Sequence, residues 1–423
     1  MIKRLTRLIR SDTAKDASTM TIGTAVAALL AAVFFIIAAR RLGPKEFGIF
    51  SLATAASFMF ADMVDLALNA ALVRFVAAER NKEEGKAEKY MKYILKIKLG
   101  IGMLLMVIVA LFAPILSKLL FGSPLPTILF LTGLGTAFQL LYTFGIAHLQ
   151  AIQRFAKAAF LTALLPGLRL VGLLLLLFFS SMTTTPTLVI YFSATAILIA
   201  VSMVVIPRGY LFVRGEGEIA KPFLKYTLPL SAGFAIAAVS GRIDNFILAN
   251  LSGSTAVGFY AAAFRLFTPF QFLAGSLSTV FAPRFAGFTN LSEARSYFRK
   301  GILAICLMSF GLLIFLPFSP FIINLFYGSD YVQSVSVLRI LFFGFALFLL
   351  QVPFTSTILF YLAKTRVFAL ISGVQLILIV VGNFALIPRF QENGSAMAFL
   401  ATQLMVLVML AIYTLLQLRE EKT

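Results

Sequence analysis

The sequence predicts an all-α membrane protein with 12 transmembrane helices arranged as two parallel six-helix repeats. Long apolar segments, the alternation of basic residues along the chain and an internal repeat together predict this fold. Among its 423 residues, 60% are hydrophobic and only 13% are charged. This composition is too apolar for an ordinary globular protein, so the chain belongs in a bilayer.

Twelve mostly apolar segments are each long enough to cross a hydrocarbon core, which takes about 20 residues of helix. The segments lie near residues 18–39, 47–69, 91–114, 125–150, 156–180, 186–207, 223–251, 256–282, 301–320, 337–363, 366–388 and 394–418. They leave little of the chain for a soluble domain.

The basic residues indicate the orientation of these segments. Of the 36 lysines and arginines, 27 fall in the first 17 residues, in every second gap after them or in the adjoining ends of the segments. The other gaps hold five, which are Arg40, Arg41, Lys45, Lys118 and Arg389. Because basic loops stay preferentially cytoplasmic, the pattern predicts a multi-pass protein of the cell membrane with both termini in the cytosol.

The net charge of +19 follows from this topology. A nucleic-acid-binding protein would collect its charge on one face, whereas here it is spread over seven cytoplasmic segments, where it also attracts anionic lipid head groups. We therefore expect membrane lipids and no nucleic acid among the partners.

A single cysteine, Cys306, excludes an intrachain disulfide.

The predicted domain plan begins with an amphipathic cytoplasmic segment, because residues 1–17 place apolar and basic side chains on opposite faces of a helix. An N-terminal six-helix lobe (18–207), a cytoplasmic linker (208–222), a C-terminal six-helix lobe (223–418) and a cytoplasmic tail (419–423) follow.

An offset of 210 residues superposes the first two spans on the seventh and eighth. Gly23 matches Gly233, Gly43 and Gly48 match Gly253 and Gly258, and Arg74-Phe75 matches Arg284-Phe285. Six helices return the chain to its starting side, so the lobes are parallel repeats. Bundles of this kind place the substrate path between their halves near mid-membrane, which predicts a transporter.

Charged residues inside the spans are the first candidates for function, because each costs several kcal/mol in hydrocarbon unless it has a partner or a wet cavity. Arg242 and Asp244 lie two residues apart in the seventh span and point in different directions on a helix. Arg242 is either a cavity cation or the partner of a distant carboxylate.

Two further arginines extend this set. Arg169 follows Pro166-Gly167, where a proline removes a backbone hydrogen bond and favours a kink, and Arg265 lies two turns into the eighth span. Both are candidates for the substrate path. Arg339 lies nearer a membrane face and is expected to snorkel.

Carboxylates and matched arginines complete the candidate residues. Asp62 and Asp65 share one face of the second span, as two groups that hold a proton or bind a cation would, although each could instead pair with an arginine. Arg74 and Arg284 lie at matching inner ends of spans two and eight. They either flank a cytoplasmic entrance or follow the orientation rule.

No enzyme motif is present. The sequence lacks a phosphate-binding loop with Lys-Ser/Thr, HExxH and GxSxG, and its one histidine, His148, cannot supply a histidine metal cage. We expect no resident cofactor, and a coupling H⁺ or Na⁺ at most.

Five sequence segments resemble the polysaccharide transport family of the multidrug/oligosaccharidyl-lipid/polysaccharide exporter superfamily, the Wzx-type flippases of lipid-linked oligosaccharides. They are ARRLGPKEFGIFSLA (39–53), LQAIQRF (149–155), GRIDNFILANLSGSTAVGFYAAAFRL (241–266), FAPRF (281–285) and LFYGSDY (325–331). The segments run from the first helix to the tenth in the family's order.

The resemblance implies a V-shaped, alternating-access bundle that moves a polyprenyl-pyrophosphate-linked glycan from the inner to the outer leaflet. It also implies functional roles for Arg242 and Asp244, which lie in the family's Arg-x-Asp stretch. From the residues, we expect Arg169, Arg242 and Arg265 to bind the head group and Asp62, Asp65 or Asp244 to tune or couple the cycle.

Three other functions are compatible with parts of the pattern. A multidrug exporter of the same superfamily would favour an acidic or neutral cavity. A membrane-embedded glycan polymerase or ligase would need acid and base side chains in a substantial outer loop, and a scaffold of a glycan assembly complex leaves the arginines unexplained. The expected flippase is a monomer that works beside glycosyltransferases and a glycan polymerase.

Overall fold

Backbone hydrogen bonds that a bilayer cannot satisfy must close within the protein, and a helix closes them within one segment. A computed structural model describes residues 12–79, 85–179, 182–213, 217–288 and 290–420. All regular structure in these ranges is helical. Most of the predicted amphipathic segment, residues 1–11, lies outside the described residues, and Asp12 already begins a helix.

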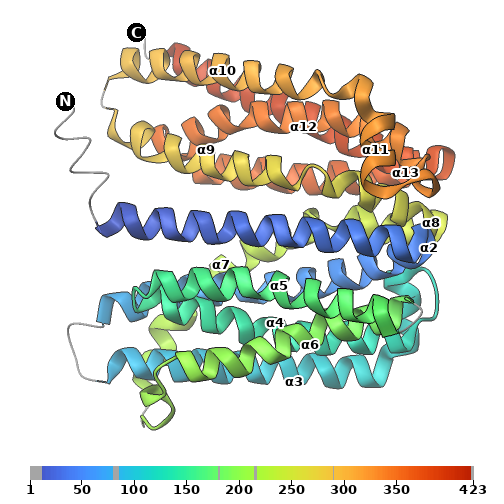
Figure 1. The fold of residues 1–423 in the computed structure, drawn as a ribbon. Coiled ribbons are helices and arrows are strands. Elements are labelled where there is room, and N and C mark those ends of the chain that lie inside the picture. The colour runs from blue at the N-terminus through green and yellow to red at the C-terminus, as the bar shows by residue number, and fades with distance from the viewer. Residues whose placement is uncertain (1–11, 80–84, 180–181, 214–216, 289, 421–423) are drawn as a thin grey trace. The chain divides into compact units, whose positions relative to one another are not determined.

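The helices follow one another through short connections (Figure 1). The first seven are α2 (Asp12–Glu79), α3 (Lys86–Phe121), α4 (Pro126–Ala151), α5 (Phe155–Phe179), α6 (Thr184–Val205), η1 (Gly209–Leu211) and α7 (Gly217–Ser240). The others are α8 (Ile243–Arg265), α9 (Thr268–Gly287), α10 (Leu291–Leu313), η2 (Leu316–Phe318), α11 (Ser319–Tyr327), η3 (Ser329–Tyr331), α12 (Ser334–Ser356), η4 (Thr357–Tyr361) and α13 (Thr365–Glu420).

Nine helical segments in the described ranges are long and apolar enough to cross a membrane, and several of them hold more than one span. The segment 18–79 has 62 residues, which would extend about 93 Å at 1.5 Å per residue, three times the hydrocarbon thickness. Non-helical residues divide these segments: Gly43 in α2, Gly253 in α8 and Gln391 in α13. The all-α membrane fold is therefore confirmed, with a helix count that agrees with 12 spans.

Contacts divide the chain into two compact units. Unit 1 comprises residues 1–42 and 53–239, and unit 2 comprises residues 43–52 and 240–423. The boundary between the two compact units thus falls after residue 239, and unit 2 also includes residues 43–52 of the first repeat. The linker predicted at 208–222 stays a prediction.

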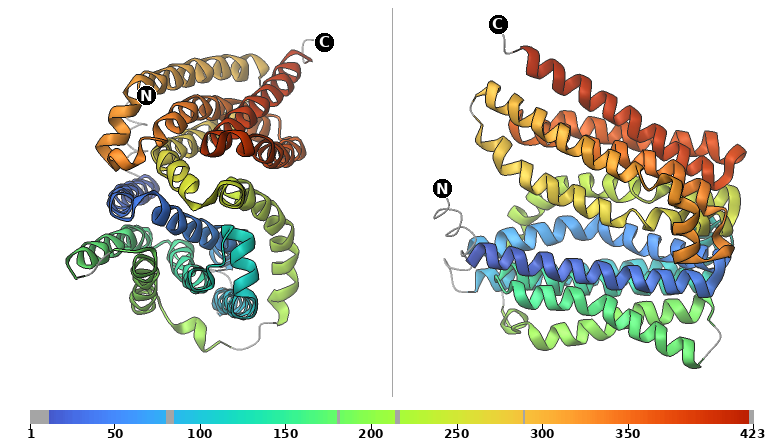
Figure 2. Two further views of the ribbon diagram at one scale, coloured as in Figure 1. Left: turned by 90° about the vertical axis from the view of Figure 1, so that its right-hand side faces the viewer. Right: turned by 45° about the horizontal axis from the view of Figure 1, so that its top comes forward.

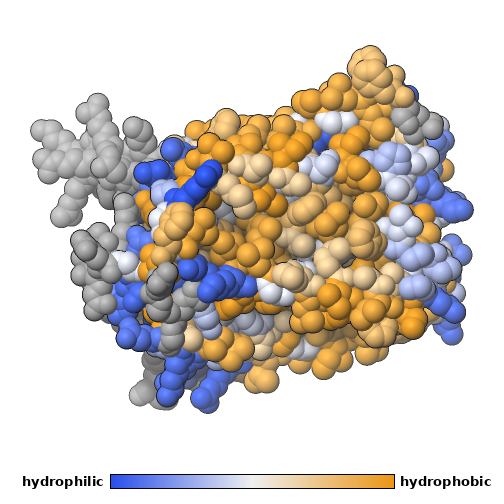
Figure 3. All heavy atoms as spheres, turned by 90° about the horizontal axis from the view of Figure 1, so that it is seen from below, coloured by the Kyte–Doolittle hydropathy of each residue, from blue (hydrophilic) through white to orange (hydrophobic). Residues whose placement is uncertain are grey.

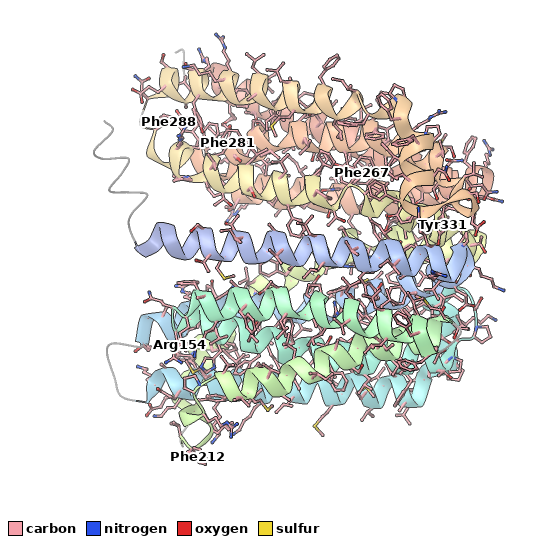
Figure 4. The ribbon with its side chains drawn as sticks, viewed as in Figure 1. Arg154, Phe212, Phe267, Phe281, Phe288 and Tyr331 are labelled. Atoms are coloured by element: carbon pink, nitrogen blue, oxygen red, sulfur yellow. The ribbon has the colours of Figure 1, made fainter. Side chains whose placement is uncertain are left out.

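In unit 1, α4 packs against α3, α5 and α6, and α5 packs against α6 (Figure 1). The core near the C-terminal end of α2 is aromatic. The Phe75 and Tyr90 rings stack with centroids 4.8 Å apart, and the ring centroid of Phe223 from α7 lies 6.0 Å from that of Phe75. Arg154 and Phe212, from two connections predicted to be cytoplasmic, lie at the same end of the unit (Figure 4). The alternation of connections agrees with the basic-residue pattern.

In unit 2, α12 packs against α8, α9, α10 and α13, the helices drawn from yellow to red in Figure 2. An aromatic stack joins them, with Phe345 4.4 Å from Phe267 and 5.1 Å from Phe399 between ring centroids. Phe288 and Tyr331 lie at opposite ends of this unit (Figure 4). The connections that carry these two residues therefore face opposite sides of the predicted membrane.

The face shown in Figure 3 is hydrophobic across its middle and hydrophilic at its two ends. Large apolar side chains such as Phe178, Phe179 and Val204 are 77–84% exposed. A soluble protein rarely leaves so much apolar surface in contact with water, whereas lipid solvates it without cost. The surface thus agrees with a multi-pass membrane protein.

The predicted repeat is confirmed in two turns, predicted to be outer ones, that share one conformation. Gly43 has φ 70° and ψ 171°, and Gly253 has φ 82° and ψ 173°. A side chain is rarely tolerated at these angles, so both turns require glycine. Each turn reverses the direction of a pair of spans.

The two turns also pack reciprocally within unit 2. A Cβ atom on Gly48 would lie 1.8 Å from the Ser254 carbonyl oxygen, and one on Gly258 would lie 1.9 Å from the Pro44 carbonyl oxygen. Pro44 and Ser254 are themselves equivalent in the repeat. Glycine at both positions lets the two backbones touch, as small residues do where membrane helices cross closely.

Substitution of either crossing glycine tests this contact. Gly48→Ala and Gly258→Ala should each destabilise the protein by about 1–3 kcal/mol, because the added methyl overlaps a backbone carbonyl that cannot rotate away. The measurement is thermal unfolding of the purified protein in detergent. Gly275→Ala is the control, since a Cβ there meets nothing within 4 Å; an equal loss in all three variants would contradict a specific crossing.

Candidate functional site

Arg169 is buried between two helices of unit 1. The side chain is 8% exposed and leaves α5 toward α6, where its Nε donates a hydrogen bond to the Tyr191 carbonyl (3.2 Å) and Nη2 donates to Thr195 Oγ1 (3.0 Å). Its guanidinium carbon lies 3.6 Å from the centroid of the Tyr191 ring. Neutral acceptors and an aromatic face thus stabilise the cation. Substrate contact at Arg169 would require α5 and α6 to separate.

Arg242 lies at a break in the seventh span. Gly241 and Arg242 form a turn between α7 and α8, and Arg242 has φ −143° and ψ −6°. Its side chain is half-buried. The break separates two helices that the sequence predicts as one span, and neither residue is a proline.

Asp244, in the first turn of α8, is held by neutral donors. It is 5% exposed and accepts hydrogen bonds from the Tyr260 hydroxyl (2.6 Å) and from the backbone and side-chain nitrogens of Asn245 (2.8 Å each). A carboxylate in a first helical turn is also stabilised by the helix dipole. Asp244 is therefore fixed in place by Tyr260 and Asn245.

Arg265 is the last residue of α8 and precedes a second break, at Leu266 and Phe267. Its half-buried guanidinium donates a hydrogen bond from Nη2 to Ser51 Oγ (3.3 Å) and lies 5.6 Å from the Phe47 ring centroid. A cation at a helix C-terminus is stabilised by the helix dipole. Arg265 contacts the first outer turn segment through these two residues.

Arg242 and Arg265 lie at similar depths on the two legs of one hairpin. Arg242 is 11 residues before Gly253 and Arg265 is 12 residues after it, about 17 and 18 Å along each helix. A hydrocarbon core is about 30 Å thick, so both reach its middle from the turn. The corresponding residues of the first repeat, Ala32 and Ala55, are uncharged and lie in the unbroken legs of α2.

Arg74 and Arg284 are exposed and each lies against a tyrosine. The Arg74 guanidinium carbon is 4.3 Å from the Tyr226 ring centroid, and that of Arg284 is 5.5 Å from Tyr297. Cation–π contacts of this kind contribute about 0.5–1 kcal/mol at exposed sites. The aromatic contacts hold both arginines near the C-terminal ends of α2 and α9.

Asp65 is paired with Lys98, a lysine that is not among the predicted site residues. Asp65 is 3% exposed and Lys98 1% exposed, and the Lys98 ammonium forms an ion pair with the Asp65 carboxylate. Asp62, one turn earlier on α2, is only half-buried. The structure therefore brings Asp65 together with Lys98 and places Asp62 in a more open environment.

The pattern of basic residues predicts that Lys98 is cytoplasmic, and this prediction is wrong. Lys98 lies 12 residues into α3, about 18 Å from the start of the helix, on a buried stripe with Ile94 and Gly102. The spacing of four residues along this stripe was the signal that could have identified it, because a lysine on the apolar face of a span needs an internal partner.

A duplicated helical bundle with charged residues at helix breaks inside its spans defines a multi-pass membrane transporter. A sequence model described as "Polysaccharide biosynthesis protein" matches residues 13–289, more than half of the chain, and a second model, "MatE", matches residues 229–385. The chain therefore belongs to the polysaccharide biosynthesis protein family, within the multidrug/oligosaccharidyl-lipid/polysaccharide exporter superfamily.

A curated relative, the capsular polysaccharide biosynthesis protein CapF of Staphylococcus aureus, is 26% identical over 187 residues, or 43% of this chain and 47% of CapF. The match thus spans about half the length of that relative.

Solved structures share the fold. The lipid II flippase MurJ in an inward closed conformation superposes with a TM-score of 0.74 at 15% identity, covering 93% of this chain and 87% of MurJ. An inward-facing multidrug resistance MATE family transporter gives 0.75 at 14% identity over 93% and 94% of the two chains. A superfamily transporter from Pyrococcus furiosus, described as having a binding pocket of reversed polarity, gives 0.65 at 15% identity over 99% and 98%.

Neutralising one partner of the buried Asp65–Lys98 ion pair tests how much the pair stabilises unit 1. Lys98→Met should destabilise the protein by about 3–5 kcal/mol, because it leaves the Asp65 carboxylate buried without its counter-charge. The double variant Asp65→Asn/Lys98→Met should regain much of this loss in thermal unfolding measurements. A single variant as stable as the double one would show that the pair is not desolvated in the protein.

Proposed function

We propose that this protein is a flippase that moves a polyprenyl-pyrophosphate-linked oligosaccharide from the inner to the outer leaflet of the cell membrane by alternating access. Membership of the polysaccharide biosynthesis protein family supports a glycan cargo. The fold shared with MurJ, described as a lipid II flippase, supports a lipid-linked one.

The observation that carries the proposal is the pair of arginines at the ends of α8. Arg242 and Arg265 are both half-buried, lie at similar depth and occupy breaks in helices that are continuous in the first repeat. Arginine offers forked donors that match phosphate oxygens, and a poorly hydrated site strengthens these contacts. Two such cations match a pyrophosphate that carries about two negative charges.

The membrane potential can drive this export. Moving a negative charge outward across an inside-negative membrane releases about 2.3 kcal/mol per charge per 100 mV. Once it has released the anionic cargo, the empty carrier has more positive charge than the loaded one, and the inside-negative potential draws it back toward the inside. The cycle needs no coupled ion. Asp62 or Asp244 tunes its charge balance, whereas Asp65 is already neutralised by Lys98. Dependence of transport on an H⁺ or Na⁺ gradient would assign Asp62 or Asp244 a coupling role.

The remaining features of the proposal follow from the cargo and the charge pattern. Both termini face the cytosol, the protein acts as a monomer, Arg74 and Arg284 attract the anionic head group at the cytoplasmic entrance, and Arg169 contributes where α5 and α6 separate. Glycosyltransferases supply the cargo and a glycan polymerase consumes it.

A multidrug exporter is the second candidate, and the match of residues 229–385 to the MatE model favours it. Its substrates are typically cations, which an acidic or neutral site would attract. Arg242 and Arg265 would repel them. The flippase is therefore the function that the charges of unit 2 support best.

Arginine removal in a transport assay tests the flippase. In proteoliposomes, Arg242→Ala and Arg265→Ala should each slow translocation of a labelled polyprenyl-pyrophosphate glycan about 10- to 100-fold, since a lost charge-assisted hydrogen bond costs about 1.5–3 kcal/mol. Lysine at either position should restore part of the translocation rate, because it keeps the positive charge but lacks the paired donors of the guanidinium group.

The matched control is Arg339→Ala, which removes an exposed arginine from α12 and should leave transport unchanged. Equal loss in the control would indicate a general effect of charge on insertion or folding. Full transport by both Arg242→Ala and Arg265→Ala would exclude the proposed head-group site, and export of cationic drugs by the wild type would favour the second candidate.

A further inference from the structure

The ammonium group of Lys98 lies inside a cage of four oxygen atoms from two other helices. Besides the Asp65 carboxylate, Nζ donates to Asn69 Oδ1 (2.7 Å), to the Leu140 carbonyl (3.1 Å) and to Thr143 Oγ1 (3.3 Å). The Phe144 ring centroid lies 6.0 Å away. The acceptors come from α2 and α4, while the lysine comes from α3.

Separate hydrogen bonds orient the oxygens of this cage. The Asn69 side-chain nitrogen donates to the second Asp65 oxygen (3.0 Å), which turns the amide oxygen toward Lys98. The Thr143 hydroxyl donates to the carbonyls of Gln139 (3.0 Å) and Leu140 (3.1 Å), so its lone pairs remain for the ammonium. The acceptor directions are therefore set by α2 and α4 without help from the lysine.

The chemistry of the cage is that of a cation site. A carboxylate, an amide oxygen, a backbone carbonyl and a hydroxyl are the hard oxygen ligands that hard metal ions take in proteins. The set carries a single negative charge, which one monovalent cation neutralises. An ammonium has three donors and no acceptor, and here it meets four acceptors, one more than it can serve with linear bonds.

We propose that these four oxygens form a monovalent-cation site that the protein fills permanently with its own lysine. Lys98 then replaces a dissociable ion such as Na⁺, and unit 1 keeps its α2–α3–α4 packing at any external sodium concentration. An ordinary structural ion pair has a different consequence: loss of Lys98 would destabilise the protein equally whatever cation is present. The proposal concerns unit 1 alone and does not depend on the transported substrate.

Truncation of the lysine separates these two possibilities. Lys98→Ala removes the tethered cation and leaves its volume open, so the protein should unfold at a lower temperature in choline chloride. Sodium chloride at equal ionic strength should reverse more than half of this decrease in Tm, and the effect should saturate with sodium concentration. The reason is that a ligand that binds only the folded state stabilises it by mass action. The full-length protein in detergent is used throughout.

Three matched proteins control the measurement. Lys98→Met fills the volume with an uncharged chain, Asp65→Asn/Lys98→Ala removes the carboxylate, and the wild type retains its lysine; none should respond to sodium in preference to choline. The proposal is overturned if Lys98→Ala has the same Tm in both salts or fails to fold when prepared in sodium. It is also overturned if the wild type or the double variant responds as strongly as Lys98→Ala.

Discussion

The hydrocarbon core offers no partner to a charge or a backbone amide, and this constraint determines most of what the structure contains. Every described span is helical, and its buried charges find partners inside the protein. Lys98 has an acid and three neutral oxygens, Arg169 has an aromatic face and two neutral acceptors, and Asp244 has a phenol and an amide. Only the first of these charges is neutralised by an opposite one.

Comparison of the two repeats separates features that both copies share from features that one copy has. The turns at Gly43 and Gly253 both have glycine at positive φ, and both are followed by a second glycine where the turn segments touch. These requirements are steric and apply equally to the two copies. The helix breaks beside Arg242 and Arg265 occur only in the second copy, where the first has an unbroken helix and alanine. Such local differences are where function is expected, because folding does not demand them.

Sequence patterns predicted the spans, their alternation and the repeat, since these depend on composition and on steric rules that act locally. The breaks in the seventh and eighth spans could not be predicted, because Gly241 and Leu266 lie in segments without a helix-breaking proline at the break itself. Pro166 lies inside α5, which continues as one helix from Phe155 to Phe179, and the kink expected there stays a prediction. Lys98 was misplaced because counting charges along the chain ignores the face of the helix on which each charge lies. Pairing between α2 and α3 is a tertiary property that spacing within either helix does not encode.

Burial then distinguishes among charges that the sequence treats alike. Lys98 and Asp65 neutralise one another and present no net charge, and Arg169 lies beneath the Tyr191 ring. Arg242 and Arg265 are half-buried at the two ends of one helical hairpin, and Asp244 in the same hairpin accepts hydrogen bonds from Tyr260 and Asn245. Because a helix break also leaves backbone groups outside regular hydrogen bonding, each arginine lies where the chain can adjust locally. The proposed flippase has to bind and release a polar head group, a task that needs positive charge on an adaptable backbone, and Arg242 and Arg265 combine these two properties.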